Sequence, residues 1–185
     1  MTWIAEIPEA EATGKLAEIY ARIREARGKV AHIMRAQSLH PEALEAHLFL
    51  YLALMFSPGG LSRAERELIA VVVSAANGCG YCLAHHAAAL EHHWDDGERV
   101  QAVARDWRAL ELPERTRRIL AFVEKLTRRP RDVGEGDVCS LRAAGLGDRE
   151  ILDAVLIASY FNFVNRVALG LGVAPSPEET RGYRY

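Results

Sequence analysis

Two cysteines and a histidine in the middle of the chain have the spacing of a reactive thiol site. Cys79 and Cys82 are three residues apart, and His86 follows four residues after Cys82. On a helix, positions i, i+3 and i+7 lie on one face, so the two sulfurs and the imidazole would share a face. At this spacing the two cysteines are about 5 to 6 Å apart, within the range that a disulfide spans. The stretch can therefore cycle between dithiol and disulfide beside a base.

A carboxylate on the preceding segment can complete this group. A glycine turn at residues 77–78 suits a tight connection between antiparallel helices, which would bring Glu67 near His86. A carboxylate that orients an imidazole, which in turn takes a thiol proton, is a general arrangement for activating a nucleophile. A free thiol has a pKa of about 8.5, which a cationic imidazole or a helix N-terminus lowers. Cys82 has the imidazole and Cys79 has the helix start, so on these grounds either thiol could attack.

Composition predicts one compact domain around this group. The 185 residues are 50% hydrophobic and 26% charged, enough for one filled core and too few to require two. A formal net charge of −2 leaves no basic surplus for nucleic acid or an anionic membrane. The first residues do not resemble a signal peptide, and the longest apolar run, residues 68–73, is too short to span a bilayer. We therefore expect a cytoplasmic protein, in which a lone C-x-x-C pair is typically catalytic or metal-binding.

Helical periodicity and helix breakers divide the chain into helices with short joints. The expected helices run from about Leu16 to Gly28, from Pro41 to Met55, from Arg63 to about Asn77, from the cysteine pair toward His93, from Gly97 through Trp107, after a break at residues 112–113 through residues 119–126 to before Pro130, from Asp137 to Ala144, and from a cap at Asp148 for six turns. The end of the chain is polar. We expect residues 174–185 to form an irregular tail.

One apolar run leaves a second fold open. Residues 68–73 are rich in valine and also suit a buried strand, and a strand followed by C-x-x-C would indicate a thioredoxin-like fold. However, Ser62 and Glu65 have capping-box spacing just before this run, and no alternating strand pattern occurs elsewhere. The sequence therefore favours an all-α, single-domain helical bundle over residues 1–185, with the C-x-x-C pair at the start of a central helix.

At these residues the sequence resembles a known family. Glu67, the cysteine pair and His86 are similar to the E-x11-C-x-x-C-x3-H signature of the alkylhydroperoxidase D-like branch of the carboxymuconolactone decarboxylase superfamily. Residues 38–41, 61–67 and 161–168 also resemble its peroxidase-related subgroup, so the resemblance covers most of the chain. The chain departs from the pattern at one position. The family's best-known members have histidine immediately before the second cysteine, where this chain has Tyr81.

The resemblance implies a function as well as a fold. It implies an all-helical homo-oligomer that reduces organic hydroperoxides with electrons from a dithiol or lipoyl-bearing protein. We expect no cofactor and no metal. By the same resemblance, Cys82 is the peroxide-attacking thiol, Cys79 the resolving thiol, and Glu67 with His86 the proton relay. A sulfenic acid on Cys82 would condense with Cys79 to a disulfide, which an external dithiol would reduce. Lactone decarboxylation is not expected, because that branch lacks the paired cysteines.

Two other functions stay open at this point. The protein could be a thiol-disulfide oxidoreductase with little peroxidase activity, because the same cysteine pair serves that chemistry. It could also be a metal-binding module, with the cysteine pair, His85 or His86, and residues 92–93 as ligands. Helix rise argues against the metal, since about 1.5 Å per residue places His92 roughly 15 Å along the axis from Cys82.

The remaining polar and aromatic residues are expected to be structural. Cys139 is expected to be a buried apolar residue without a function, and His85 an ordinary packed residue. Glu67 could also be only a charge paired with a neighbouring arginine. We expect Trp3, Trp94 and Trp107 to serve packing, and His92 and His93 to be helix-end residues. Asn162, Asn165 and Arg166 are expected to be structural hydrogen-bonding groups or oligomer contacts, with site lining as a further alternative.

Overall fold

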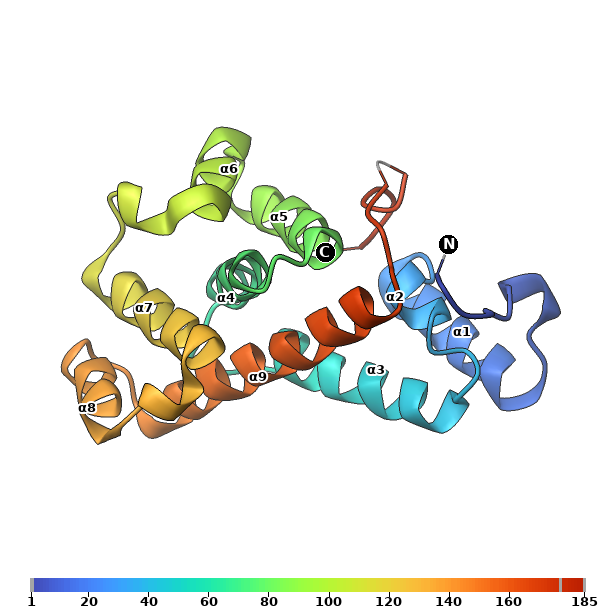
Figure 1. Ribbon diagram of the computed structural model, residues 1–185, viewed down its shortest axis with the longest axis horizontal. Coiled ribbons are helices and arrows are strands. Elements are labelled where there is room, and N and C mark those ends of the chain that lie inside the picture. The colour runs from blue at the N-terminus through green and yellow to red at the C-terminus, as the bar shows by residue number, and fades with distance from the viewer. Residues whose placement is uncertain (1, 177, 185) are drawn as a thin grey trace.

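The computed structural model describes residues 2–176 and 178–184. Over these residues the chain is α-helical with short 3-10 turns and contains no β-strand (Figure 1). In chain order the helices are α1 (Gly14–Arg27), α2 (His32–Arg35), α3 (Pro41–Phe56), α4 (Arg63–Ala76), α5 (Gly80–Trp94), α6 (Gly97–Asp106), α7 (Glu114–Arg128), α8 (Glu135–Ala143) and α9 (Asp148–Gly170). The predicted all-α class is confirmed, and residues 68–73 lie within α4 rather than in a strand.

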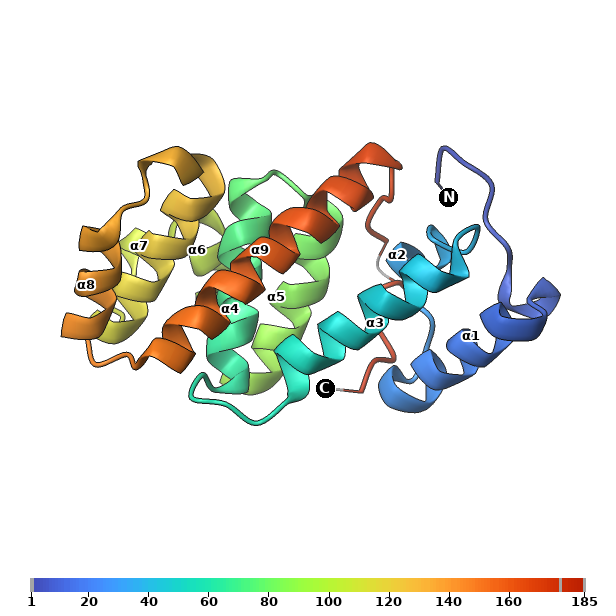
Figure 2. The ribbon, with the colours of Figure 1, turned by 90° about the horizontal axis from the view of Figure 1, so that it is seen from below.

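Helix α4 is the central element of the bundle. Its start is fixed by a capping box, in which the Ser62 hydroxyl accepts from the Glu65 backbone N–H at 3.2 Å and the Glu65 carboxylate accepts from the Ser62 N–H at 2.7 Å. Every residue from 66 to 74 is buried, because α5, α7 and α9 pack around it (Figures 1 and 2). A carboxylate on this helix is therefore kept away from water.

A two-residue turn reverses the chain between α4 and α5. Gly78 has a φ of +67°, a left-handed conformation that glycine adopts without steric cost. The Cys79 N–H then donates to the Ser74 carbonyl at 3.0 Å, and Cys79 takes the N-cap position of α5. The predicted turn at residues 77–78 is confirmed, and it places α5 alongside α4 (Figure 2).

The long helix α9 crosses α4 and α3 and holds this turn in place (Figure 2). The Asn77 amide donates to Asn162 at 3.1 Å and to Asn165 at 2.9 Å, and the Asn165 amide donates to Ser74 at 3.2 Å. The two asparagines of α9 are therefore structural hydrogen-bonding groups, as predicted. Among the described residues, α9 alone has the length and apolar composition to span a membrane, but 56% of that stretch is buried inside the bundle.

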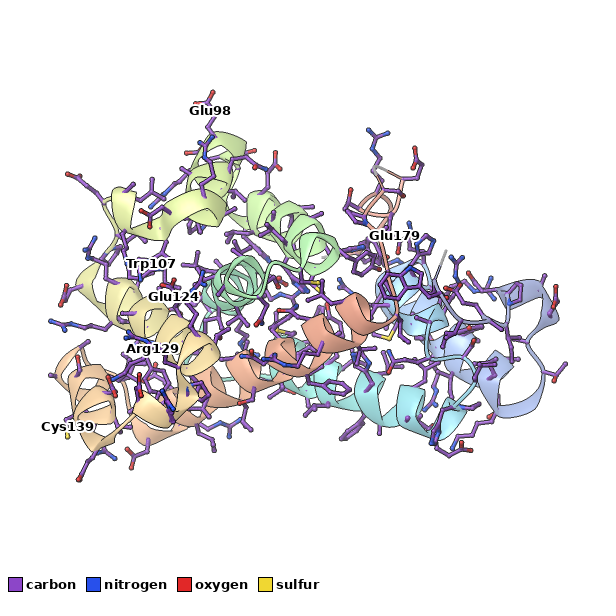
Figure 3. The ribbon with its side chains drawn as sticks, in the orientation of Figure 1. Glu98, Trp107, Glu124, Arg129, Cys139 and Glu179 are labelled. Atoms are coloured by element: carbon purple, nitrogen blue, oxygen red, sulfur yellow. The ribbon has the colours of Figure 1, made fainter. Side chains whose placement is uncertain are left out.

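Four details of the sequence prediction are wrong. Helix α8 begins two residues before Asp137, and the cap of α9 is Gly147 rather than Asp148. Cys139 is exposed, because α8 lies at the edge of the bundle, where Figure 3 shows this side chain pointing outward. Trp3 is 77% exposed, since the N-terminal segment lies outside the core and its indole only covers Gly172. The other tryptophans do pack, with Trp107 buried beside Glu124.

The last described residues fold back onto the bundle. Residues 174–176 and 178–184 contain turns but no helix, and they lie across α1, α2 and the start of α5 (Figure 1). Glu179 within this tail is only 4% exposed, which is unusual for a carboxylate in a segment without regular structure. The tail is thus part of the packed structure.

The join between α3 and α9 predicts a dependence of stability on pH. His47 lies 2.6 Å from the Tyr160 hydroxyl, and burial lowers its pKa from 6.5 to about 4. Between these two values the unfolded chain binds a proton that the folded chain does not, so the free energy of unfolding should fall as the pH drops from about 6.5 toward 4. Urea denaturation of His47→Gln should show a shallower fall over this range. An equally steep fall in the variant would contradict this assignment.

Candidate active site

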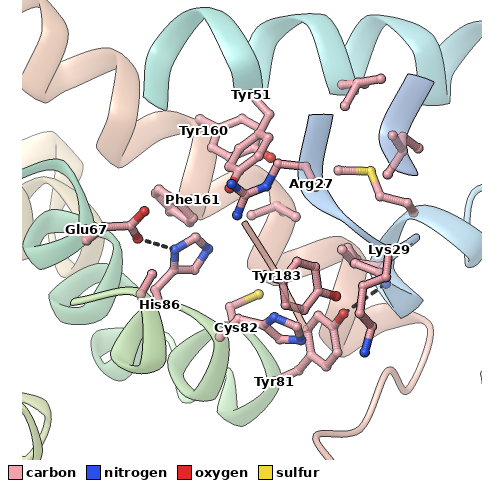
Figure 4. A pocket seen from close by; sticks show the side chains of 18 residues that line it. Arg27, Lys29, Tyr51, Glu67, Tyr81, Cys82, His86, Tyr160, Phe161 and Tyr183 are labelled. Atoms are coloured by element: carbon pink, nitrogen blue, oxygen red, sulfur yellow. Dashed lines mark hydrogen bonds and ion pairs between the residues drawn. The ribbon is translucent and has the colours of Figure 1, made fainter. Parts of the chain in front are cut away.

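One cysteine of the pair, Cys82, lines a cavity of about 70 Å³ between the N-terminal helices, α4, α5, α9 and the tail. Figure 4 shows the Cys82 sulfur and the His86 ring projecting from α5 toward this space. The other walls include the aromatic side chains of Tyr51, Tyr160 and Phe161 and the cationic side chains of Arg27 and Lys29. A thiol and an imidazole therefore face a small and largely apolar enclosure.

The predicted carboxylate and imidazole are in direct contact. Glu67 on α4 has no exposed side-chain surface, and its Oε2 accepts from the His86 Nδ1 at 2.6 Å (Figure 4). Its Oε1 accepts two bonds from Arg63, at 2.9 Å from Nε and 2.5 Å from Nη2. The Glu67 carboxylate is thus paired with two cationic or potentially cationic groups. Since Nδ1 carries the donated proton, the Nε2 of His86 is left to accept another.

The charge on Glu67 is stabilised by these partners. Burial raises the pKa of this carboxyl, but the neighbouring His86 and Arg63 lower it by more, so its pKa is below the ordinary value. The imidazole also packs edge-on against Phe161, with ring centres 4.5 Å apart. The ring is therefore held in one orientation by an ionised carboxylate on one side and an aromatic wall on the other.

The two thiols have opposite pKa shifts. A hydrogen bond from Cys82, opposed by burial but assisted by the backbone N–H groups of Cys82 and Tyr81, lowers the pKa of Cys79 to about 7. The hydrogen bond to Cys79 and burial raise the pKa of Cys82. The first negative charge of the pair thus resides on Cys79 at the helix start, whereas only Cys82 lines the cavity. The lowered pKa favours Cys79 as the thiolate, whereas contact with the cavity favours Cys82. A substrate in the cavity meets Cys82 because Cys79 does not line it.

Tyr81, which lies between the cysteines, points to a second cluster. Its hydroxyl donates to Glu179 Oε1 at 3.0 Å and accepts from the Ile33 backbone N–H at 3.2 Å. Burial raises the pKa of Glu179, but the His32 backbone N–H, the Tyr81 hydroxyl and Lys29 bring it below the ordinary value. Burial also lowers the pKa of His85 to about 3, so this ring is neutral at physiological pH. The position where the family's best-known members have histidine is therefore used here to bind the tail.

Sequence reasoning brought the four predicted residues together correctly but missed others. The structure places Cys79, Cys82, His86 and Glu67 at the facing parts of α4 and α5, as the spacing predicts. From the sequence, a neighbouring arginine is only an alternative to a catalytic role of Glu67, whereas in the structure Arg63 binds this carboxylate together with His86. The position of Arg63 one turn before Glu67 is a signal for such a pair. No pattern in the sequence indicates that Glu179 binds Tyr81 or that Tyr183 lines the cavity. Within residues 2–176 and 178–184, no group of three histidine, cysteine or acidic side chains has the geometry to hold a metal ion.

The fold and site together define an all-helical protein with a buried dithiol beside a carboxylate and imidazole pair. Residues 41–125 match the carboxymuconolactone decarboxylase family. The crystal structure of an uncharacterized peroxidase-related protein from Silicibacter sp. TM1040 is 32% identical, covers 97% of this chain and 95% of its own, and has a TM-score of 0.87. A second, from Ralstonia eutropha JMP134 and described as an alkylhydroperoxidase AhpD core, is 28% identical, covers 97% and 94%, and has a TM-score of 0.88.

A more distant similarity extends to a larger protein. Sestrin-2 from Homo sapiens is 22% identical over 151 residues, which are 80% of this chain but only 30% of sestrin-2. The chain thus spans about a third of the length of that relative.

The chain belongs to the carboxymuconolactone decarboxylase family, in its alkylhydroperoxidase D-like branch.

The coupling between the thiols can be tested by titration. Removal of the Cys82 sulfur in Cys82→Ala should raise the pKa of Cys79 from about 7 by about one to two pH units, because a hydrogen bond to a charged group contributes about 1.5–3 kcal/mol. The measurement is the ultraviolet absorbance of the thiolate against pH, with Cys139→Ser as the parent protein so that the exposed thiol does not contribute. A Cys79 pKa that stays near 7 in the variant would show that the helix start alone sets it.

Proposed function

We propose that the protein is a thiol-dependent peroxidase that reduces organic hydroperoxides through a disulfide between Cys79 and Cys82. The observation that carries this proposal is the contact between Glu67 and His86 beside a cavity-facing thiol. The aromatic and aliphatic side chains in the walls suit the organic part of such a peroxide. The peroxidase-related neighbours of the same branch support the same reaction.

The first step oxidises Cys82. The thiol proton passes to Nε2 of His86, whose Nδ1–H stays bonded to Glu67. The resulting thiolate attacks the terminal peroxide oxygen, so that an S–O bond forms as the O–O bond breaks. The alkoxide leaves with the two electrons of the O–O bond and takes the proton back from His86. The products are an alcohol and Cys82 sulfenic acid.

The second step closes the disulfide. Cys79, already inclined toward the thiolate by its lowered pKa, attacks the Cys82 sulfur and displaces hydroxide, which leaves as water once protonated. An external dithiol then reduces this disulfide by thiol–disulfide exchange. The external dithiol becomes a disulfide, and both cysteines return to thiols. The contact with Cys82, assisted by backbone N–H groups at the helix start, thus lowers the pKa of the resolving sulfur, while the imidazole activates the sulfur that meets the peroxide.

Burial of the sulfurs favours a small oxidant over a protein substrate. Cys79 is 1% exposed and Cys82 is 3% exposed, whereas a thiol that attacks protein disulfides is typically accessible. The alternative, a protein thiol-disulfide oxidoreductase, requires a protein surface to reach these atoms. We accordingly propose a dithiol or lipoyl-bearing protein as the reductant, because a dithiol on an extended arm approaches a buried disulfide more closely than a protein surface does.

Association of copies is a further part of the proposal. Large apolar side chains are exposed on α3 and α9, including Phe49 at 76% and Phe163 at 49%. Exposed apolar side chains of this size on adjacent helices suit an interface with a second copy. Light scattering coupled to size-exclusion chromatography would measure the assembly directly.

Cysteine variants test the order of the steps. Cys82→Ser should abolish turnover of tert-butyl hydroperoxide in a reductant-coupled assay, because the cavity then contains no nucleophilic sulfur. Cys79→Ser should still consume one equivalent of peroxide and stop at a sulfenic acid on Cys82, which mass spectrometry detects as one added oxygen. Cys139→Ser should match the parent, since this thiol is exposed on a different part of the bundle. If Cys82→Ser retains turnover, the assignment of Cys82 is wrong.

The role of the carboxylate is tested by an isosteric change. Glu67→Gln should lower kcat/KM by about a hundredfold, because the neutral amide no longer stabilises the imidazolium that forms during proton transfer. Glu98→Gln on α6 is the matched control, since that side chain is exposed and distant from the cavity (Figure 3). Circular dichroism should show that both variants fold. A Glu67→Gln enzyme within twofold of the parent would exclude the carboxylate from the relay.

A further inference from the structure

The tail approaches the cysteine pair through one buried carboxylate. Glu179 Oε1 accepts from the His32 backbone N–H at 2.6 Å and from the Tyr81 hydroxyl at 3.0 Å, while its Oε2 lies 3.6 Å from the Lys29 Nζ. Lys29 also donates to three backbone carbonyls of the tail, at residues 178, 179 and 181. The tail is therefore held to α2 and α5 by a small set of polar contacts around one acidic side chain.

These contacts place Tyr183 against the cavity. The Tyr183 ring lines the same cavity as Cys82 (Figure 4), and it packs edge-on against His85 with ring centres 5.2 Å apart. Its hydroxyl lies 3.4 Å from Glu179, and the Arg184 N–H that follows donates to the Arg27 carbonyl at 3.0 Å. The contact with Glu179, which precedes Tyr183, and the hydrogen bond of Arg184, which follows it, hold the ring in place. The ring forms one wall of the cavity.

The enclosure that this wall completes is small. Its volume of about 70 Å³ is less than half of the roughly 150 Å³ of an engineered cavity that binds benzene. A hydroperoxide with only a few heavy atoms fits such a space, but one with an aryl group does not fit without displacing a wall. The walls contributed by α4, α5 and α9 belong to the tightly packed core, whereas Tyr183 belongs to a segment without a helix.

We propose that Tyr183, held in place by Glu179 and Tyr81, is a specificity-determining residue that limits the size of the molecules that reach Cys82. This inference rests on the proposed function, because it assigns the substrate class of that same thiol. Small peroxides react with the tail in place. Bulky hydroperoxides are rejected because they must displace a ring that the Glu179 contacts retain.

Paired substrates measure this selectivity. Tyr183→Ala should raise the ratio of kcat/KM for cumene hydroperoxide to that for hydrogen peroxide by about tenfold, within the range that a change of pocket size produces. Glu179→Ala should shift the ratio in the same direction, because the tail loses its bonds to Tyr81 and His32. Arg181→Ala is the control within the tail, since that side chain is exposed, and its ratio should equal the parent value. A Tyr183→Ala ratio within twofold of the parent would overturn the proposal.

A second measurement does not depend on peroxidase turnover. In a Cys139→Ser background, the reduced protein is treated with iodoacetamide and separately with a fluorescein maleimide, and labelling of Cys82 is followed by peptide mass spectrometry. Tyr183→Ala should accelerate labelling of Cys82 by the fluorescein maleimide about tenfold relative to labelling by iodoacetamide. If turnover is absent but this acceleration occurs, the proposed function fails and the size limit stands. If the substitution changes both labelling rates by the same factor, Tyr183 does not select molecules by size.

Discussion

The site depends on a charged carboxylate that is completely removed from water. An isolated buried charge costs several kcal/mol, so Glu67 can remain ionised only because Arg63 and His86 contact its two oxygens. This requirement links three parts of the structure. Arg63 must lie one turn earlier on α4, the turn at residues 77–78 must be tight, and α5 must begin in the register that brings His86 opposite. A shift of one residue in α5 would leave the carboxylate without one of its partners.

The long helix α9 supports this register from the other side. Its two asparagines bind the residues just before Cys79, so the start of α5 is fixed to a helix that runs through most of the bundle. Because these groups are buried or half-buried, each unsatisfied amide would cost about 1–3 kcal/mol. Burial, turn geometry and amide bonding therefore fix one position for the cysteine pair. In that position the hydrogen bond between the two thiols lowers the pKa of Cys79 and raises the pKa of Cys82, and backbone N–H groups at the helix start also lower the pKa of Cys79.

Local patterns in the sequence predict most of this arrangement. The capping box before α4, the glycine turn and the heptad-like spacing of the cysteines and histidine each act within a few residues, so the contact between Glu67 and His86 could be predicted. The contact between Tyr81 and Glu179 joins residues 98 positions apart and belongs to a segment without periodicity, so no local rule indicates it. Cys139 was misplaced for a related reason. Its apolar character suggests burial, but α8 lies at the margin, where few neighbours are available to cover it.

The position of Tyr183 in the chain also bears on biosynthesis. Chains emerge from the ribosome starting at the N-terminus, and α1 to α9 can pack before the residues that follow them are released. During that interval the cavity beside Cys82 lacks the wall that Tyr183 forms. The wall that Tyr183 forms is therefore completed only after the core helices and the thiol pair have been synthesised.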